Sequence, residues 1–282
     1  MRINHNISSM VTQGTLNRVN REMSTSLERL STGLRINRAS DDAAGLGVSE
    51  NLRTQVRGTA QARRNAQDGI AALTIAEGAA NEISDILQRM RELAVQSAND
   101  TLTDTERAYT NQEFQQLISE IDRIAEVTNY NGMKLISDTE GHTTNTRFGV
   151  GEGSNVWIDA NASDSDRIQV QIAVLSTEGL NIDDQDLTDQ ASSVEAITAL
   201  DAAIDDVNTM RSDMGAYINR LDHAINNLTI SNTNQQAAES LIRDVDFAHE
   251  SSRFTRNQIL TQSGTAMLAQ ANMVPQSVLS LI

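Results

Sequence analysis

Residues 66–94 read AQDGIAALTIAEGAANEISDILQRMRELA, and this stretch decides the fold class. Its apolar residues recur every three or four positions, which is the spacing of one face of a helix. They are Ala66, Ile70, Leu73, Ala76, Ala80, Ile83, Leu87, Met90 and Ala94. Traced back through Leu52 and Val56, the pattern predicts a single helix over about residues 48–98.

The length of this helix constrains the architecture. About fifty residues at 1.5 Å each reach ~75 Å, whereas a compact globule of this chain length is roughly 50 Å across. Gly58, Gly69 and Gly78 are possible breaks, each costing about 1 kcal/mol relative to alanine. The apolar pattern keeps its phase across Gly69 and Gly78, so we expect a continuous helix in an elongated molecule.

Similar patterns flank this helix on both sides. One runs through Leu16, Val19, Met23, Leu27, Leu30 and Leu34, and the stretch SDDAAGLG at 40–47 is expected to break it. A capping box at Thr103–Glu106 begins a helix that ends near NYNGMKL at 129–135. From Val194 to Leu228 the helical spacing returns, and we expect it to continue towards the C-terminus with a change of phase.

The region between these helices differs in composition. Over residues 136–190 Thr, Gly, Asn and Asp become frequent, and Ile168, Val170 and Ile172 alternate with polar residues. Residues 156–158 form a second β-prone run. Together these patterns predict two to four short strands in this region.

The predicted fold class is therefore mainly α. It is an elongated antiparallel helical bundle or coiled coil formed by the N- and C-terminal segments, with a small β-hairpin region in the middle. We expect a terminal helical domain of residues 1–42 and 245–282, a long-helix domain of 43–137 and 190–244, and a short β-rich insert at 138–189.

Charge separates the ends of the chain from its middle. The 282 residues carry a formal net charge of −16, which argues against a nucleic-acid surface and against binding to anionic membranes. Residues 138–206 hold fifteen acidic residues and two arginines, whereas residues 3–17 and 257–282 hold no charged residue. This distribution suggests that the ends are buried and the middle is solvated.

The last residues, NMVPQSVLSLI at 272–282, form an apolar stripe through Val274, Val278 and Leu281. A two-helix unit leaves much of its apolar surface exposed, so we expect these side chains to pack on other copies of the chain. The longest apolar runs have about four residues, far too few to span a bilayer. Because no Lys or Arg lines the polar face of this stripe, we expect no insertion into a membrane surface either. The first residues lack the apolar core of a signal peptide.

Two stretches approach metal-binding patterns. His249-Glu-Ser-Ser-Arg253 resembles the HExxH zinc motif, but Arg253 replaces the second histidine. The acidic loop Asp183–Asp189 lacks the glycine and the final glutamate that an EF-hand requires. The absence of cysteine excludes disulfides and thiolate chemistry. We expect no enzymatic activity, no metal and no cofactor.

Several long stretches resemble bacterial flagellins. They are INHNISSM at 3–10, LERLSTGLRINRASDDAAGLGVSE at 27–50, RNAQDGI at 64–70, LQRMRELAVQSAND at 87–100, EIDRIAEVTNYNGMKLI at 120–136 and the whole of 241–282. The resemblance implies a subunit of the flagellar filament, whose terminal segments pair in the inner tube and become ordered on assembly. Only about 53 residues separate the two halves, so we expect no large outer domain.

The resemblance also implies particular residues and partners. Residues expected to form the self-assembly core are Leu27, Leu30, Leu34, Leu268, Val274, Val278, Leu279 and Leu281. A Toll-like flagellin receptor would contact Arg89, Leu93 and Glu113. Further expected partners are an export chaperone and the hook-associated and cap proteins, and the expected location is extracellular, reached without a cleaved signal peptide. The alternatives are a flagellin-like hook–filament junction protein and a metalloprotease on a flagellin scaffold.

Overall fold

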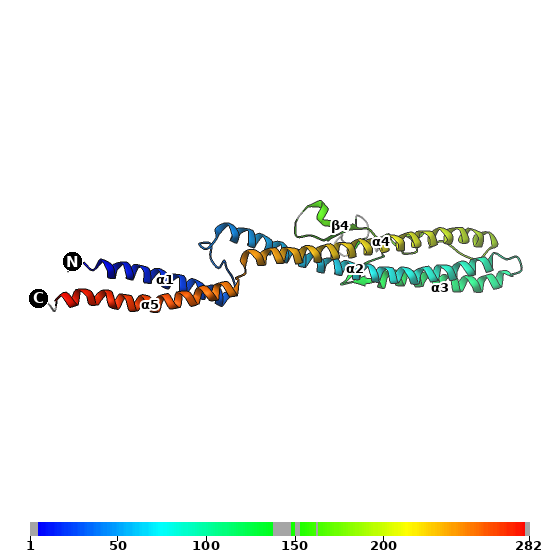
Figure 1. The fold of residues 1–282 in the computed structure, drawn as a ribbon. Coiled ribbons are helices and arrows are strands. Elements are labelled where there is room, and N and C mark those ends of the chain that lie inside the picture. The colour runs from blue at the N-terminus through cyan, green and yellow to red at the C-terminus, as the bar shows by residue number, and fades with distance from the viewer. Residues whose placement is uncertain (1–4, 138–147, 150–152, 162, 280–282) are drawn as a thin grey trace. The chain divides into compact units, whose positions relative to one another are not determined.

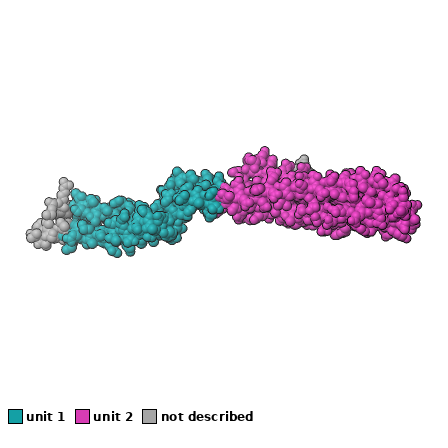
Figure 2. All heavy atoms as spheres, turned by 45° about the vertical axis from the view of Figure 1, so that its right-hand side comes forward, with its two compact units in different colours: residues 1–56, 233–282 teal, residues 57–232 magenta. Residues whose placement is uncertain are grey.

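The computed structural model describes residues 5–137, 148–149, 153–161 and 163–279. These residues form long α-helices and two short antiparallel hairpins, which confirms the mainly α fold class (Figure 1). The chain divides into two compact units (Figure 2). Unit 1 consists of residues 1–56 and 233–282, and unit 2 of residues 57–232. The three-part division expected from the sequence remains a proposal.

The helix predicted over 48–98 is present without a break as α2, Ala43–Ser97. Asp42 begins it, because its Oδ1 accepts a hydrogen bond from the Gly45 backbone N–H at 2.8 Å. The glycines at 58 and 69 do not interrupt the helix. Instead they allow close packing, since a Cβ atom on Gly58 would lie 2.4 Å from the Cβ of Ala160.

The first helix ends earlier than the sequence predicted. Helix α1 spans Ile7–Thr32, and Gly33 ends it in the left-handed conformation with φ of 73°. The stretch at 40–47, expected to break the helix, instead contains the start of α2. Leu34 therefore lies beyond α1 and pairs with Asp244 as an isolated β-bridge.

In unit 1, α1 packs against α5, Phe247–Leu279 (Figure 1). The pair is antiparallel: the Asn6 amide donates to the carbonyl of Ala271 at 2.7 Å, and Arg29 lies 3.7 Å from Glu250. The C-terminal helical pattern is not continuous as expected, because α4, Gln190–Arg243, ends before residues 244–246 and α5 begins after them. Asp246 caps α5 by accepting from the backbone N–H of His249 at 3.1 Å.

In unit 2, α2 and α4 also run antiparallel. Arg91 contacts Asp201 at 2.5 Å, Glu77 contacts Arg211 at 3.5 Å, and the Asn232 amide donates to the Thr59 hydroxyl at 2.9 Å. Residue numbers rise along α2 as those of its partners fall along α4, so the predicted pairing of these two segments is present. Helix α3, Asp104–Val127, begins with the predicted capping box at Thr103–Glu106.

Two hairpins lie in unit 2. Strands β1, Asn129–Tyr130, and β2, Met133–Lys134, are joined by Asn131 and Gly132 with φ of 51° and 80°. Such positive values are those of the tight turn that an Asn-Gly pair favours. Strand β3, Ser154–Trp157, pairs with β4, Arg167–Val170, after the short 3-10 helix η2, Asp164–Asp166. Part of the predicted 138–189 insert lies outside the described residues.

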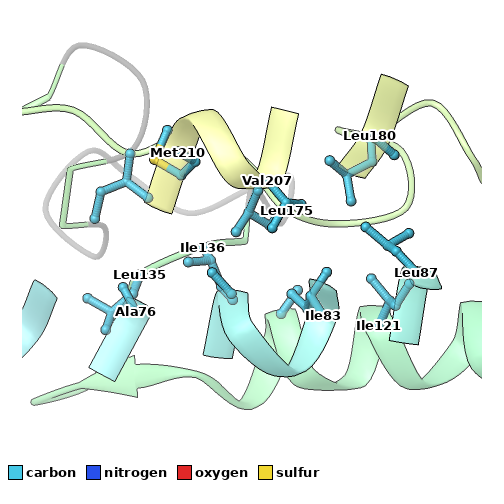
Figure 3. Packing of buried hydrophobic residues seen from close by; sticks show 14 of the residues in the cluster. Ala76, Ile83, Leu87, Ile121, Leu135, Ile136, Leu175, Leu180, Val207 and Met210 are labelled. Atoms are coloured by element: carbon cyan, nitrogen blue, oxygen red, sulfur yellow. The ribbon is translucent and has the colours of Figure 1, made fainter. Parts of the chain in front are cut away.

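The core of unit 2 is apolar and closed. Side chains from α2, α3, α4 and the segments at 135–136 and 175–187 point into one interior, as Figure 3 shows for Leu87, Ile121 and Val207. The described part of the insert is solvated at its acidic residues but also contributes to the core, because Leu175, Leu180, Ile182 and Leu187 are buried there. The backbone of Leu187 is fixed by the Asn111 side chain at 3.0 Å and by the Ser97 hydroxyl at 3.0 Å.

Candidate self-association surface

The two helices of the terminal pair meet along a seam that contains many polar residues. On α5 the residues turned towards α1 alternate in steps of three and four, which is the heptad spacing of a coiled coil. They are Glu250, Phe254, Asn257, Thr261, Gly264, Leu268 and Ala271. Glu250 and Asn257 are only 4% and 3% exposed. We call the group of Ser26, Glu250 and Asn257, which are buried, and Arg29, which is half-buried, the polar seam.

Three atoms of the polar seam are buried without a hydrogen-bond partner in the part of the chain that the structure describes. They are Arg29 Nε, Glu250 Oε1 and Asn257 Nδ2. An unsatisfied buried polar group costs about 1–3 kcal/mol, so this pairing is less stable than an apolar one of the same size. Neither the pattern of apolar residues nor the resemblance indicated these residues.

The outward faces of the same helices carry exposed apolar side chains among their polar ones. We call the following exposed residues the terminal apolar surface: Ile7, Met10, Val11 and Leu27 on α1, and Phe247, Ile259, Leu260, Met267 and Met273 on α5. A shallow groove along α5 is lined by Ser251, Ser252, Thr255, Arg256, Ile259 and Leu260. Apolar surface of this kind on paired helices marks an interaction site.

The residues predicted for self-assembly fall into three groups. Leu27 is 57% exposed and lies on the terminal apolar surface, because the helical phase places Ser26 in the seam instead. Leu30, Leu34 and Leu268 are half-buried between the exposed and the buried sides. The side chains of Val274, Val278 and Leu279, and all of Leu281, lie outside the described residues.

The structure brings together two of the three residues predicted for receptor recognition. Arg89 donates to Glu113 at 3.0 and 2.9 Å and to Glu92 at 3.0 Å. The hydrogen bonds that Arg89 donates to these carboxylates, first to that of Glu113, raise the pKa of Arg89. Leu93 is only 2% exposed and packs in the core of unit 2, so it supports this site from beneath rather than forming its surface.

The stretch that resembled a zinc motif has another role. Its Glu250 faces Arg29 in the polar seam, and the described residues contain no group of three or more His, Cys, Asp or Glu side chains suited to hold a metal ion. Among the same residues, no helix combines the length and the hydropathy that crossing a membrane requires.

Paired terminal helices with an outward apolar surface, joined to a long-helix unit with a closed core, define a helical structural protein. The N-terminal part, residues 3–141, matches the family model for the bacterial flagellin N-terminal helical region. The C-terminal part, residues 197–282, matches the model for the bacterial flagellin C-terminal helical region. The chain belongs to the bacterial flagellin family, whose members are structural proteins rather than enzymes.

Individual relatives agree with this assignment. The chain is 46% identical to a flagellin of Halalkalibacterium halodurans over 282 residues, covering all of both chains. It is 44% identical over 293 residues to the flagellar filament 33 kDa core protein of Treponema phagedenis, again over all of both chains. The crystal structure of Bacillus cereus flagellin is 34% identical with a TM-score of 0.50, and the match covers 62% of this chain and 94% of that one. The full-length matches agree with the expectation that the central region holds no large outer domain.

Proposed function

We propose that this chain polymerises into the filament of a bacterial flagellum and so serves in swimming motility. The observation that carries the proposal is the terminal apolar surface, which has no cover in the described part of the chain. Uncharged residues at 3–17 and 257–282 make burial of these helices between copies inexpensive, because no charge has to be desolvated there. Contacts between unlike faces that do not close into a ring would extend the assembly without limit.

Further steps of the proposal concern location and partners. The subunit acts outside the cell, and an export chaperone covers the apolar residues of its C-terminal segment until then. Hook-associated and cap proteins contact the same ends at the two tips of the filament. Ordering of α1 and α5 on assembly offsets part of the gain from burial, at about 1–2 kcal/mol per ordered residue.

Seeded polymerisation tests the proposal. Purified chain is mixed with short filament seeds, and the pelleted fraction and electron micrographs are recorded. We expect long tubes from the full chain and none from a chain lacking 260–282, while circular dichroism shows that the shortened chain is still helical. Filaments of normal length from the shortened chain would contradict the assembly role of α5.

A second proposed role is recognition of the monomer by a Toll-like flagellin receptor. The supporting observation is the solvent-exposed group of Arg89, Glu92 and Glu113 on α2 and α3. Arg89→Asp should abolish activation of a receptor-reporter cell line. Arg123→Asp, which breaks a comparable exposed ion pair with Glu120, is the matched control, and equal loss of signal in both variants would exclude a role specific to Arg89.

A further inference from the structure

The methionines of this chain are distributed unequally between its two units. Met90 and Met214 in unit 2 are fully buried and Met210 is 9% exposed. Met10, Met267 and Met273 in unit 1 are 66%, 62% and 60% exposed. Among the methionines that the structure describes, the three most exposed therefore all belong to the terminal apolar surface.

No charged residue lies near these three methionines in the sequence, and two of them share a helix with other exposed apolar side chains. Met10 and Val11 lie three and four residues after Ile7 on α1, so both are neighbours of Ile7 on the helix surface. Met267 lies one heptad after Leu260 and so on the same face of α5. All these residues except Leu260 are at least 57% exposed, and Leu260 is 45% exposed.

Contacts across the helix pair place Met10 and Met267 at the same level. Asn6 bonds to Ala271, and a Cβ atom on Gly264 would lie 3.1 Å from Leu16 Cδ1. Met10 lies between Asn6 and Leu16 on α1, and Met267 lies between Gly264 and Ala271 on α5. Met273 follows Ala271 by two residues. The three thioethers are thus gathered in one part of the terminal pair.

We propose that Met10, Met267 and Met273 form an oxidation site through which hydrogen peroxide prevents polymerisation; this rests on the proposed filament function. Each thioether sulfur takes one oxygen atom from the peroxide, the sulfur loses two electrons, and the peroxide leaves as water. The product, a sulfoxide, is a strong hydrogen-bond acceptor in place of an apolar group. A surface that must be buried between copies then carries up to three polar groups without partners.

Assembly should in turn protect these methionines from oxidation. In a subunit already within a filament the terminal apolar surface is covered, so the same sulfurs should react slowly. Oxidants would therefore act on free subunits and leave existing filaments intact. Because methionine sulfoxide reductases reverse the reaction, the block is reversible.

The test begins with peptide mapping by mass spectrometry. Free chain and filaments are treated with hydrogen peroxide for increasing times, and the sulfoxide fraction at each methionine is measured. We expect Met10, Met267 and Met273 to oxidise first in the free chain and much more slowly in filaments, with Met90 and Met214 unreacted in both. Oxidation of Met90 and Met214 ahead of the three, or equal rates in chain and filament, would overturn the proposal.

The second arm measures the critical concentration for seeded growth before and after peroxide. For the unmutated chain we expect a rise of roughly tenfold or more, the effect of a single unsatisfied buried acceptor. The variant Met10→Leu/Met267→Leu/Met273→Leu is compared with its own untreated sample, and its ratio should stay near one. Met90→Leu/Met214→Leu should keep the full peroxide effect. An unchanged critical concentration in the oxidised chain, or an equal rise in the triple variant, would overturn the proposal.

A third arm tests this inference separately from the proposed function. It uses the unmutated chain, so it remains informative if the triple variant does not polymerise. Oxidised unmutated chain is incubated with methionine sulfoxide reductases A and B and a thiol reductant, and growth is measured again. Recovery supports the oxidation site, and failure to recover after the sulfoxides have disappeared overturns it. If untreated chain fails to grow on seeds, the proposed function itself is wrong, and the inference fails with it.

Discussion

The two units of this chain differ in where they place polar and apolar residues. Unit 2 encloses an apolar core drawn from α2, α3, α4 and the central segments, and its ion pairs, such as Arg91 with Asp201, lie outside. Unit 1 encloses a seam in which Arg29 meets Glu250 and leaves Met10, Val11 and Leu27 outside. The same helical spacing therefore serves two purposes, depending on which residues fill the inward positions.

This difference predicts which unit is more stable by itself. Unit 2 removes its own apolar surface from water, at about 25 cal/mol per Å², whereas the terminal pair hides polar groups and exposes apolar ones. Unit 1 gains most when another copy covers its outer face.

The largest expected effect comes from emptying the core of unit 2. Leu87→Ala removes a side chain with 0% exposure and should lower the free energy of unfolding by about 2–5 kcal/mol. Leu27→Ala should change it by about 0.5 kcal/mol or less, since that side chain is 57% exposed. Urea unfolding followed by circular dichroism of the helices, which are present in both units, measures both. Similar losses in the two variants would contradict the comparison.

The next effect concerns the polar seam. Arg29→Met leaves the Glu250 carboxylate buried without its cation, which should destabilise the helix pair by about 3 kcal/mol. Adding Glu250→Leu should recover most of this loss, because an apolar pair of similar size suits the seam at least as well. Hydrogen exchange of the α1 and α5 amides measures the effect, and an unchanged exchange rate in Arg29→Met would show that the ion pair does not hold the seam.

A smaller pair of effects compares two glycines of α2. Gly78→Ala adds a methyl group into open space and should stabilise unit 2 by up to about 1 kcal/mol. Gly58→Ala should destabilise it by about 1 kcal/mol or more, because the new Cβ would meet that of Ala160 at 2.4 Å. Thermal unfolding of the two variants should shift in opposite directions; a stabilised Gly58→Ala would mean that the 158–161 segment moves freely.

The smallest effect depends on pH in the connection between α1 and α2. The backbone N–H groups of Arg38 and Asn37 donate to Asp41 and hold its pKa below its ordinary value of 3.8. A carboxylate with a lowered folded pKa contributes stability above its ordinary pKa and loses this contribution as the pH falls through the folded value. Asp41→Asn should therefore unfold more easily than the unmutated chain near neutral pH, and the difference should vanish in acid. A difference that grows in acid would contradict this assignment.

The sequence predicted most of the fold because the apolar spacing of α2 and α4 is regular and the capping box at Thr103 is local. It failed where tertiary context decides. Leu27 belongs to the apolar pattern of the first helix, but the phase set by Leu16, Val19 and Met23 turns Ser26 inward and leaves Leu27 exposed, and its expected role in self-assembly stays a prediction. Glu250 and Asn257 were missed because only apolar residues were followed. Their spacing of seven residues would have placed both on one face of α5.

The candidate site was predicted only in outline. Uncharged ends indicated an association surface, but which residues face outward depends on how α1 and α5 pair, and this pairing joins residues more than two hundred positions apart. Leu93 illustrates the same limit, because an apolar residue beside Arg89 could equally belong to a surface patch or to the core. The structure places it in the core.

The antiparallel pairings are nested in chain order, because the α1–α5 pair encloses the α2–α4 pair. Bringing Asn6 to Ala271 in an unfolded chain closes a very long loop, whose entropic cost grows with the logarithm of its length. Once the inner helices have formed, the open loop shrinks to the few residues of the two connections. Folding should therefore proceed from the middle of the chain outward, and the terminal pair should form last.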